Sequence, residues 1–262
     1  MIFIESRTTF LLSYRKKGAI MKLTFLGTRG NIEAKTARHR RHSSILIQYR
    51  TTKLIIDWGL DWITKRKKLD EINPKAICIS HAHPDHAQGL KHGAPCPVYA
   101  SEESWEIMRQ YPIQKKITIK PKEKIIVGSI KIQPFPVVHS LTAPAVGYKV
   151  TAGKHTIFYV SDLISIIDQN QALKNVQMYI GDGASITRPI IRYRGDIPMG
   201  HTTIKNQIIW CAHQGIPEAI FTHCGSQIVE GDGRTLGAKI RNIGKKYGVK
   251  VKVAYDGMEI TL

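Results

Sequence analysis

The sequence predicts a layered α/β domain, and three observations lead to that fold class. Segments patterned like strands alternate with segments patterned like helices in both halves of the chain. The 262 residues are 42% hydrophobic and 23% charged, an ordinary globular composition with enough apolar residues to bury a sizeable core. Several apolar strand-like segments end directly in a histidine or an aspartate. Strands that end in this way would place reactive side chains along one rim of a sheet.

The first half of the chain is predicted to hold short strands with helices between them. Ser101 is a typical helix N-cap, and Glu103 and Ser104 follow it in the first turn of the second of these helices. The predicted strands are 22–26, 44–48, 53–56, 76–79 and 98–100, and the predicted helices are 60–69 and 101–110.

The second half is predicted to begin with four strands and then to alternate helices with strands. The predicted strands are 124–127, 130–138, 146–151, 156–160, 176–180, 219–222, 249–254 and 258–262, and the predicted helices are 163–173, 202–214 and 234–247. The chain has no visible internal repeat and no linker rich in proline, glycine or serine. Residues 21–262 are therefore predicted to form a single domain.

Residues 1–20 are predicted to be an extension ahead of that domain. They contain a short apolar patch, residues 8–14, followed by Arg15-Lys16-Lys17. The patch is too short for a secretory signal and its charges lie on the wrong side. The segment is interpreted as the product of an upstream start codon or as a poorly ordered extension, with an extra edge strand as the alternative.

The charge balance favours a polyanionic partner. Thirty-nine Lys and Arg residues against 20 Asp and Glu give a formal net charge of +19, which suits nucleic acid or a phosphorylated substrate. The alternative is a lysine-rich surface with no such partner. No run of about 18 apolar residues is present, so no transmembrane helix and no membrane partner are expected. The four cysteines show no CxxC pair and no disulfide-like spacing, which fits a reduced, cytoplasmic chain.

The run His81-Ala82-His83-Pro84-Asp85-His86 predicts a metal site. It places three imidazoles and a carboxylate directly after an apolar strand. Imidazole ligands suit zinc, and the carboxylate leaves manganese or iron open. One tetrahedral ion rarely takes four ligands from six residues, so the crowding indicates two ions. The alternative is a solvated, histidine-rich loop.

Four more predicted strands end in a ligand-type residue, namely Asp57, His139, Asp162 and His223. One histidine or aspartate after a strand means little. Five strand ends of this kind in one chain indicate a site built on the rim of a sheet, where a rigid scaffold can hold ions.

In their order along the chain, these residues resemble the five motifs of the metallo-β-lactamase fold hydrolases, over roughly residues 21–262. The resemblance implies a four-layer αββα sandwich with the site at one edge of two sheets. It assigns His81, His83 and His139 to a first ion, Asp85, His86 and His223 to a second, and Asp162 to both. It also implies that Asp57 supports the ligand imidazoles through hydrogen bonds. The alternative for Asp57 is a cap on the turn before the next helix.

A second resemblance concerns the substrate. Gly200-His201-Thr202-Thr203 is similar to the His-Ser-Thr region of the tRNA 3′-processing endonucleases (RNase Z). Phe25-Leu26-Gly27-Thr28 and Ser43-Ser44-Ile45-Leu46 also resemble that branch and the related cyclic phosphodiesterases. In that branch the corresponding histidine donates a proton to the leaving oxygen, so His201 is the predicted general acid. The alternative for His201 is a structural residue in the N-cap region of helix 202–214.

Two departures from the endonuclease pattern limit the comparison. The endonucleases pair this histidine with a glutamate, whereas this chain has Asp182, one methylene shorter, which is predicted to orient His201. They also carry a long tRNA-gripping arm between the third and fourth motifs. His139 and Asp162 are only 23 residues apart, and a strand, a turn and a strand fill that interval. Maturation of tRNA 3′ ends in the familiar mode is therefore not expected unless a basic surface or a partner replaces the arm.

The expected function is that of a two-metal hydrolase, a phosphodiesterase or nuclease that uses a metal-bridging hydroxide as nucleophile, with zinc as the expected ion. Asp85, His201 and Asp182 are the predicted catalytic side chains. The alternatives are an acyl hydrolase, such as a β-lactamase, lactonase or thioesterase, and a non-catalytic scaffold. A homodimer is an open possibility, because dimers are common in that branch.

Substrate contacts are the least specific predictions. Arg40 and Arg41 lie in a polar loop that could overhang the site, and Ser226 could offer a backbone N–H group. Further anion-binding candidates are Arg38, His39, His42, Arg188, Arg192 and Arg194. The alternative is solvated loop charge. Aromatic residues near these arginines are sparse, so no base-stacking platform is evident.

Overall fold

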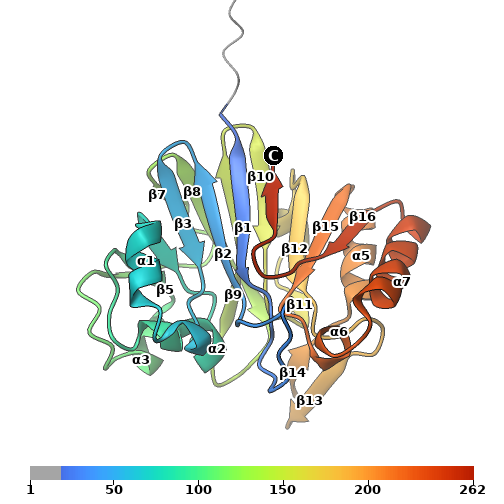
Figure 1. Ribbon diagram of the computed structural model, residues 1–262, viewed down its shortest axis with the longest axis horizontal. Coiled ribbons are helices and arrows are strands. Elements are labelled where there is room, and N and C mark those ends of the chain that lie inside the picture. The colour runs from blue at the N-terminus through green and yellow to red at the C-terminus, as the bar shows by residue number, and fades with distance from the viewer. Residues whose placement is uncertain (1–18) are drawn as a thin grey trace, which may run out of the picture.

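The computed structural model describes residues 19–262, and it is a four-layer αββα sandwich, as predicted (Figure 1). The first sheet has the strand order β17-β1-β2-β3-β4-β5-β6. Its strands are β1 (Met21–Gly27), β2 (Ser44–Tyr49), β3 (Thr52–Ile56), β4 (Ala76–Cys78), β5 (Val98–Ala100), β6 (Lys116–Thr118) and β17 (Glu259–Thr261).

The second sheet has the order β11-β8-β9-β10-β12-β15-β16, with β7 paired to β8. Its strands are β7 (Ile125–Val127), β8 (Ile130–Val138), β9 (Ala145–Ala152), β10 (His155–Tyr159), β11 (Ser165–Ile166), β12 (Met178–Asp182), β15 (Glu218–Thr222) and β16 (Lys250–Val253). A separate two-stranded hairpin, β13 (Ile190–Arg194) and β14 (Ile197–His201), stands apart from both sheets.

Helices cover the outer face of each sheet (Figure 1). The helices are η1 (Leu60–Trp62), α1 (Arg66–Ile72), α2 (Pro84–Ala87), η2 (Gln88–Leu90), α3 (Glu102–Ile107), α4 (Gln169–Leu173), α5 (Ile204–His213), α6 (Ser226–Val229) and α7 (Gly233–Lys246). None of the helices within residues 19–262 is long and apolar enough to cross a membrane.

Three apolar clusters hold the four layers together. One lies between the sheets and includes Phe25, Ile47 and Tyr148. A second joins the outer face of the second sheet to α5 and α7, and a third joins the outer face of the first sheet to α1, α2 and α3. The strands buried on both faces read as continuous apolar runs for this reason.

Two predicted helices differ from the structure. Helix 60–69 is wrong, because a 3₁₀ turn over Leu60–Trp62 precedes α1, and the Trp62 indole N–H donates to the His42 carbonyl. Helix 163–173 is wrong over its first half, since the N–H group of Ile164 donates to the carbonyl of Val138 and β11 adds to the sheet beside β8; only Gln169–Leu173 is helical, as α4. The hairpin β13–β14 and strand β6 were not predicted. The prediction for segment 1–20 falls almost entirely outside the described residues.

The topology explains why ligand-type residues gather at one edge. Strands β3 and β4 pair in parallel, and so do β10, β12 and β15. Parallel strands end at the same edge of their sheet, so the residues that follow them meet there. Figure 1 shows α2 and the hairpin toward that lower edge.

Candidate metal centre

The histidine run forms a tight connection from β4 into α2. His83 is extended, with φ −62° and ψ 151°, because the residue before a proline avoids helical geometry, and Pro84 then takes the first position of α2. Asp85 and His86 lie in that single turn and are buried. Gly59 packs against the turn so closely that a Cβ there would lie 1.7 Å from the Asp85 carbonyl oxygen. Glycine is therefore required at position 59 for Asp85 to reach the site.

Three imidazoles form the first cluster. His81 Nε2 lies 2.9 Å from His83 Nδ1, and His139 Nε2 lies 3.4 Å from the same atom. The three ligand atoms could hold one metal ion. The structure thus brings together the residues predicted for the first ion.

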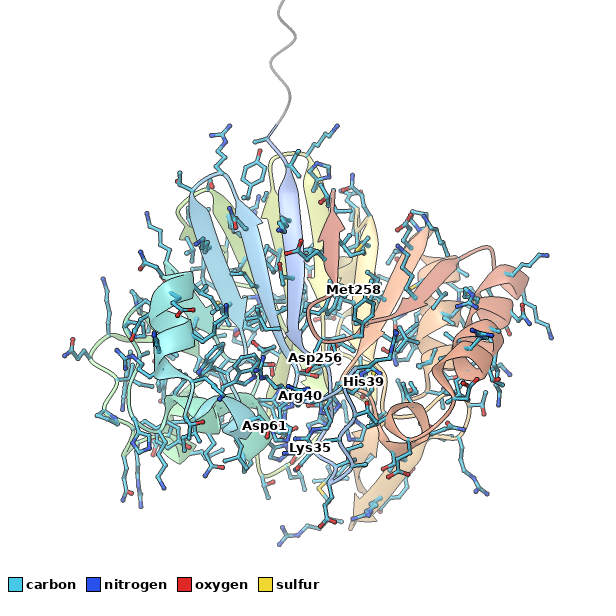
Figure 2. The ribbon with its side chains drawn as sticks, viewed as in Figure 1. Lys35, His39, Arg40, Asp61, Asp256 and Met258 are labelled. Atoms are coloured by element: carbon cyan, nitrogen blue, oxygen red, sulfur yellow. The ribbon has the colours of Figure 1, made fainter. Side chains whose placement is uncertain are left out.

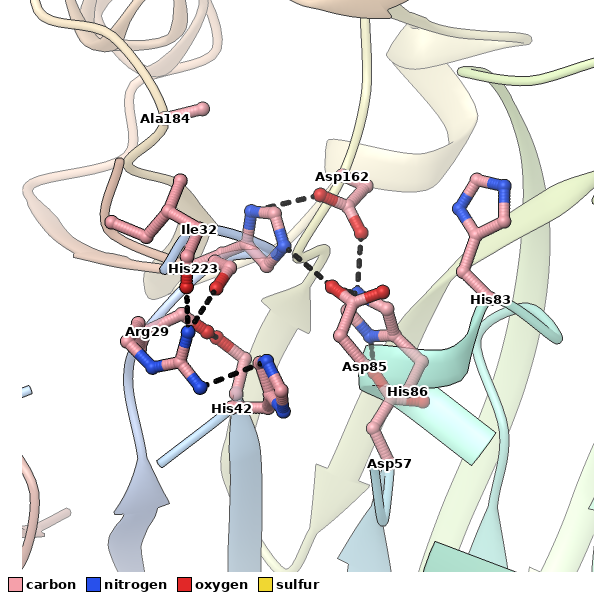
Figure 3. Close-up of polar contacts among 12 residues, drawn as sticks. Arg29, Ile32, His42, Asp57, His83, Asp85, His86, Asp162, Ala184 and His223 are labelled. Carbon is pink, nitrogen blue, oxygen red and sulfur yellow. Dashed lines mark hydrogen bonds and ion pairs between the residues drawn. The ribbon is translucent and has the colours of Figure 1, made fainter. Parts of the chain in front are cut away.

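Two carboxylates and two imidazoles form the second cluster, which contains Asp85, His86, Asp162 and His223 (Figure 3). Asp85 Oδ2 lies 3.0 Å from His86 Nε2 and 3.3 Å from His223 Nε2. Asp162 Oδ2 lies 2.7 Å from His86 Nε2 and 3.4 Å from His81 Nε2. Asp162 is therefore within reach of both clusters, the position expected for a shared ligand.

Hydrogen bonds behind the clusters fix the orientation of the rings. Asp57 accepts from His86 Nδ1 at 2.9 Å and from the backbone N–H and the hydroxyl of Ser80 at 2.7 and 2.8 Å (Figure 3). Ser80 Oγ lies 3.0 Å from His81 Nδ1, and the Gly200 carbonyl accepts from His139 Nδ1 at 3.0 Å. With Nδ1 engaged in each ring, the Nε2 lone pair of each faces the clusters.

The donor set fits divalent cations. His86 Nε2, Asp162 Oδ1 and His223 Nδ1 are buried atoms that make no hydrogen bond within residues 19–262, although carboxylates lie at ion-pair distance from both rings. Burial would raise the pKa of Asp85, but His86 and His223 lower it well below its usual range, so the carboxylate is ionised. Burial holds the pKa of His81 well below its usual value, so that ring is neutral. Burial lowers the pKa of His86 and of His223, but the neighbouring carboxylates raise both well above the usual value. Neutral imidazoles and ionised carboxylates are the forms that bind metal, so these two rings would lose a proton when an ion binds.

His201 and Asp182 form a pair beside the second cluster. His201 Nδ1 lies 2.7 Å from Asp182 Oδ2 and 3.5 Å from Asp162 Oδ1. Asp182 is completely buried at the end of β12, and its other carboxylate oxygen accepts from the Ala184 N–H at 2.8 Å. Burial lowers the pKa of His201, but the carboxylate of Asp182 outweighs it and the net shift is upward. The shorter aspartate reaches the imidazole without the extra methylene of a glutamate.

These groups open into a cavity of about 430 Å³. The walls come from the metal clusters, from Asn31 in the loop after β1, from Ser140 and Thr142 after β8, and from the hairpin, which contributes Ile190, Arg192, Met199 and His201. The cavity is polar at its base and has apolar and cationic side chains on the hairpin side. Its size is that of a small-molecule pocket, so part of a larger substrate must lie outside it.

The three predicted substrate contacts lie away from this cavity. The backbone N–H groups of Arg40 and Arg41 both donate to Asp256 at 3.0 Å, and Figure 2 shows Arg40 beside Asp256. The guanidinium of Arg41 lies over the Trp62 ring, 4.9 Å from its centroid. Ser226 is exposed at the start of α6. None of the three predicted residues is among those that line the main cavity, and their contact with substrate stays a prediction.

Sequence reasoning missed a buried ion pair that braces the site. Arg29 is 2% exposed, and its guanidinium pairs with the carboxylate of Asp61. The same guanidinium donates to His42 Nε2 at 3.0 Å (Figure 3). The neighbouring Gly30 N–H donates to the Cys224 carbonyl at 3.0 Å, next to His223. A single arginine after a strand carries no sequence signal of this role, because its partner is 32 residues away.

Comparison with known proteins agrees with this fold. A family model described as a beta-lactamase superfamily domain matches residues 52–224. The crystal structure of the metallo-beta-lactamase fold protein YhfI from Bacillus subtilis superposes with a TM-score of 0.73 at 19% identity, covering 93% of this chain and all of that one. The metallo-β-lactamase fold predicted from the motif order is thereby confirmed.

Curated relatives are nucleases. Ribonuclease Z of Methanococcus maripaludis is 32% identical over 154 residues, covering 49% of this chain and 48% of that protein. Exodeoxyribonuclease WalJ of Streptococcus pneumoniae is 29% identical over 149 residues, covering 49% of this chain and 55% of that protein. The alignments span only about half the length of these relatives.

Proposed function

The chain belongs to the beta-lactamase superfamily domain family, and from that premise we propose that it is a metal-dependent phosphodiesterase or nuclease. The similarity to a ribonuclease and an exodeoxyribonuclease supports a phosphodiester substrate over an acyl substrate. The net charge of +19 supports the same choice, since a basic chain attracts phosphate-rich substrates. We include in the proposal that residues 21–262 act as one hydrolase domain.

The observation that carries this proposal is the His201–Asp182 pair, 2.7 Å apart, at the wall of the cavity that holds the metal clusters. With Nδ1 directed at Asp182, the other ring nitrogen of His201 is left to donate a proton. A leaving alkoxide of a phosphodiester needs such a proton, and general acid catalysis of this kind is worth about 10²–10⁴-fold in rate.

We further propose two ions, one for each cluster. Divalent ions supply an activated water near neutral pH and neutralise charge on phosphoryl oxygens. Five imidazoles among the proposed ligands favour zinc, and the carboxylates keep manganese and iron as alternatives. Asp162 is proposed as the ligand common to both ions, and Asp57, Ser80 and the Gly200 carbonyl as the groups that orient the rings.

A substrate panel tests the proposal. The full chain, loaded separately with zinc, manganese and iron, is assayed against an activated phosphodiester, a 2′,3′-cyclic nucleotide, short RNA, short DNA, a cephalosporin and a lactone. We expect turnover of one or more phosphodiesters and none of the acyl substrates. Turnover confined to the cephalosporin or the lactone would discard the phosphodiesterase in favour of an acyl hydrolase. Metal content measured on the same samples counts the ions.

A further inference from the structure

The hairpin β13–β14 is the one two-stranded sheet within residues 19–262 that joins neither large sheet. It projects from the edge of the sandwich at which the metal clusters lie (Figure 1). Its tip is a two-residue turn in which Gly195 has φ 59°, a conformation that suits glycine at the first turn position. Tyr193 at this tip is 70% exposed. An isolated hairpin of this kind needs an anchor at its base and leaves its faces free for contact.

The register of the hairpin determines which side chains share a face with His201. His201 lies opposite Ile190, Met199 opposite Arg192, and Ile197 opposite Arg194. Directly opposed residues, and residues two apart on one strand, point to the same face. That face, called here the site face, therefore carries Ile190, Arg192, Arg194, Ile197, Met199 and His201. The cavity lining agrees, because Ile190, Arg192, Met199 and His201 all border the cavity.

Building on the proposed function, we propose that the site face binds the backbone of a single-stranded nucleic acid whose scissile phosphate lies in the cavity. A nucleic-acid strand that leaves the cavity would contact Arg192 first and Arg194 next. The two arginines are two residues apart on one strand, about 6.6 Å, which is comparable to the separation of successive phosphates in an extended chain. Arginine forks bind phosphate oxygens in pairs, and the Ile190, Met199 and Ile197 side chains offer apolar contact to sugars and bases.

The charges on the hairpin are free to take up such a ligand. Arg192 and Arg194 are both exposed. Among the described residues, the arginines engaged in ion pairs are Arg29 and Arg66, so neither hairpin arginine is neutralised by a carboxylate. The site face itself has no acidic residue, since the single aspartate of the hairpin, Asp196, sits in its turn.

The depth of the site favours one strand over a duplex. His81 is 0% exposed and His139 7% exposed, so the ligands lie below the rim of a cavity of about 430 Å³. A single nucleic-acid strand can place one phosphate in that space, whereas in a duplex the complementary strand would have to occupy the same volume. A small cyclic nucleotide would fit the cavity but would leave Arg194 without a partner, because Arg194 lies beyond the lining.

Gly200, next to His201, ties the hairpin to His139 of the metal centre. The Gly200 N–H donates to the His139 carbonyl at 2.9 Å, and the Gly200 carbonyl accepts from His139 Nδ1 at 3.0 Å. Gly200 has φ 130°, and a Cβ there would lie 1.9 Å from the Ile190 carbonyl oxygen. A nucleic-acid strand bound to the site face would therefore lie at a fixed position relative to His139 and to the proton donor His201. This arrangement gives the chain a gripping element although the interval from His139 to Asp162 has no arm.

The test compares Arg194→Ala with Lys154→Ala, in the metal-loaded full chain. Lys154 is an exposed cation in the turn between β9 and β10, at the opposite end of the strand that leads to Asp162, so its loss removes the same charge away from the site. Substrates are single-stranded DNA and RNA from a dinucleotide to a dodecamer, and the matched duplexes. Binding of labelled dodecamers is followed separately by fluorescence anisotropy, which does not depend on turnover.

We expect Arg194→Ala to lower kcat/KM for single-stranded dodecamers by about tenfold, the effect of losing one charged hydrogen-bonding contact. The ratio of wild-type to variant kcat/KM should grow with strand length. The dependence of log affinity on log salt should flatten by about 0.7, the value for one phosphate contact to a single strand. Arg194→Lys should restore part of the loss, and Lys154→Ala should match wild type. Comparison of the RNA and DNA series shows whether the bound single strand is RNA or DNA.

Three outcomes would overturn the inference. Arg194→Ala could match Lys154→Ala in both affinity and salt dependence. Arg194→Ala could lower the affinity and kcat/KM for duplexes as much as for single strands. Sedimentation could show a wild-type dimer that Arg194→Ala dissociates with no change in nucleic-acid affinity, which would make the hairpin a contact between two copies of the chain. If wild type hydrolyses no phosphodiester, the proposed function fails, and the anisotropy comparison still decides whether the hairpin binds strands.

Discussion

The metal-bearing rim and the β13–β14 hairpin differ in almost every physical respect, although Gly200 and His201 belong to both. On the rim, the reactive side chains follow buried strands, and His81, His86 and His139 are each oriented by a second hydrogen bond, as when Asp57 holds His86. On the hairpin, Arg192, Tyr193 and Arg194 are exposed, and the strands pair only with each other. If the hairpin binds the substrate as proposed, the chemistry rests on a rigid scaffold and the choice of substrate rests on a part that can vary without disturbing that scaffold.

The largest effect is expected from loss of a predicted ligand. His81→Ala should lower turnover of every phosphodiester by about 10³-fold or more, since several kcal/mol of charge stabilisation are lost with the metal. Metal content, measured by mass spectrometry, should fall in parallel. The ratio of long-strand to short-strand turnover should stay as in wild type. A shift in that ratio would show that the rim also selects substrate length.

His201→Ala separates proton donation from metal binding. Turnover of an unactivated diester should fall by about 10²–10⁴-fold. Metal content should be unchanged, because His201 lies outside the predicted ligand set. A diester with a good leaving group needs less protonation of its leaving oxygen, so its turnover should fall less in this variant. Full activity on the unactivated diester would contradict the role assigned to the His201–Asp182 pair.

Asp57→Asn tests the support behind the rim. The change keeps the shape of the side chain but weakens the bond to His86 Nδ1, and metal affinity should fall by about 10- to 100-fold. Chelator competition measures this affinity directly. Thermal unfolding of the metal-free protein serves as the control, since a loss of affinity without loss of native structure isolates the orientation of the ring.

Gly200→Ala should damage both regions at once. The φ of 130° and the 1.9 Å approach to Ile190 force a shift of β14, at a cost of about 1–3 kcal/mol. Both metal affinity and strand affinity should fall. Gly248→Ala is the matched control, because Gly248 has φ 70° with open space around it and lies at the end of α7. Equal effects of the two variants on metal affinity would mean that the link through His139 does not matter.

The smallest effect is a pH dependence of stability. Burial, and then Arg29, lowers the pKa of His42 to about 4, against about 6.5 in an unfolded chain. The unfolded state binds more protons between these values, so stability falls as pH drops from about 6.5 and the loss is complete below about 4. Solvent screening limits the contribution to about 1 kcal/mol, or about 2–4 °C. The fall in Tm between pH 7 and pH 5 should be smaller in His42→Gln than in wild type; an equal fall would exclude His42 as its source.

The parts of the molecule that the sequence predicted are those with a local signature. The ligand-type residues were found because each follows an apolar strand, and the motif order then identified the αββα sandwich. Asp182 was proposed as a partner of His201 because it stands where the similar endonucleases carry a glutamate, and the structure brings the two side chains to 2.7 Å.

The parts that were missed depend on distant contacts. Leu163–Leu173 has helical spacing, but the Leu163 N–H donates to Asp182 and the Ile164 N–H to Val138, and these tertiary bonds replace the helix before α4. The hairpin strands lack the alternation of a half-buried sheet because neither large sheet pairs with them and much of their surface is exposed, so only the turn at Gly195 marks them. Arg29 and Asp61 pair across 32 residues, which no local pattern reveals.

The two-residue turn at Gly195 and Asp196 closes a regular hairpin, so the number of residues in its strands sets the distance from His201 to the tip. Each two-residue step along a strand advances by about 6.6 Å, so inserting one residue pair in each strand moves the tip outward by that amount and keeps His201 on the same face. Hairpin length would then set the distance between the scissile phosphate and the point at which the nucleic-acid strand is bound. Grafted hairpins of different length offer a route to enzymes that leave overhangs of different length.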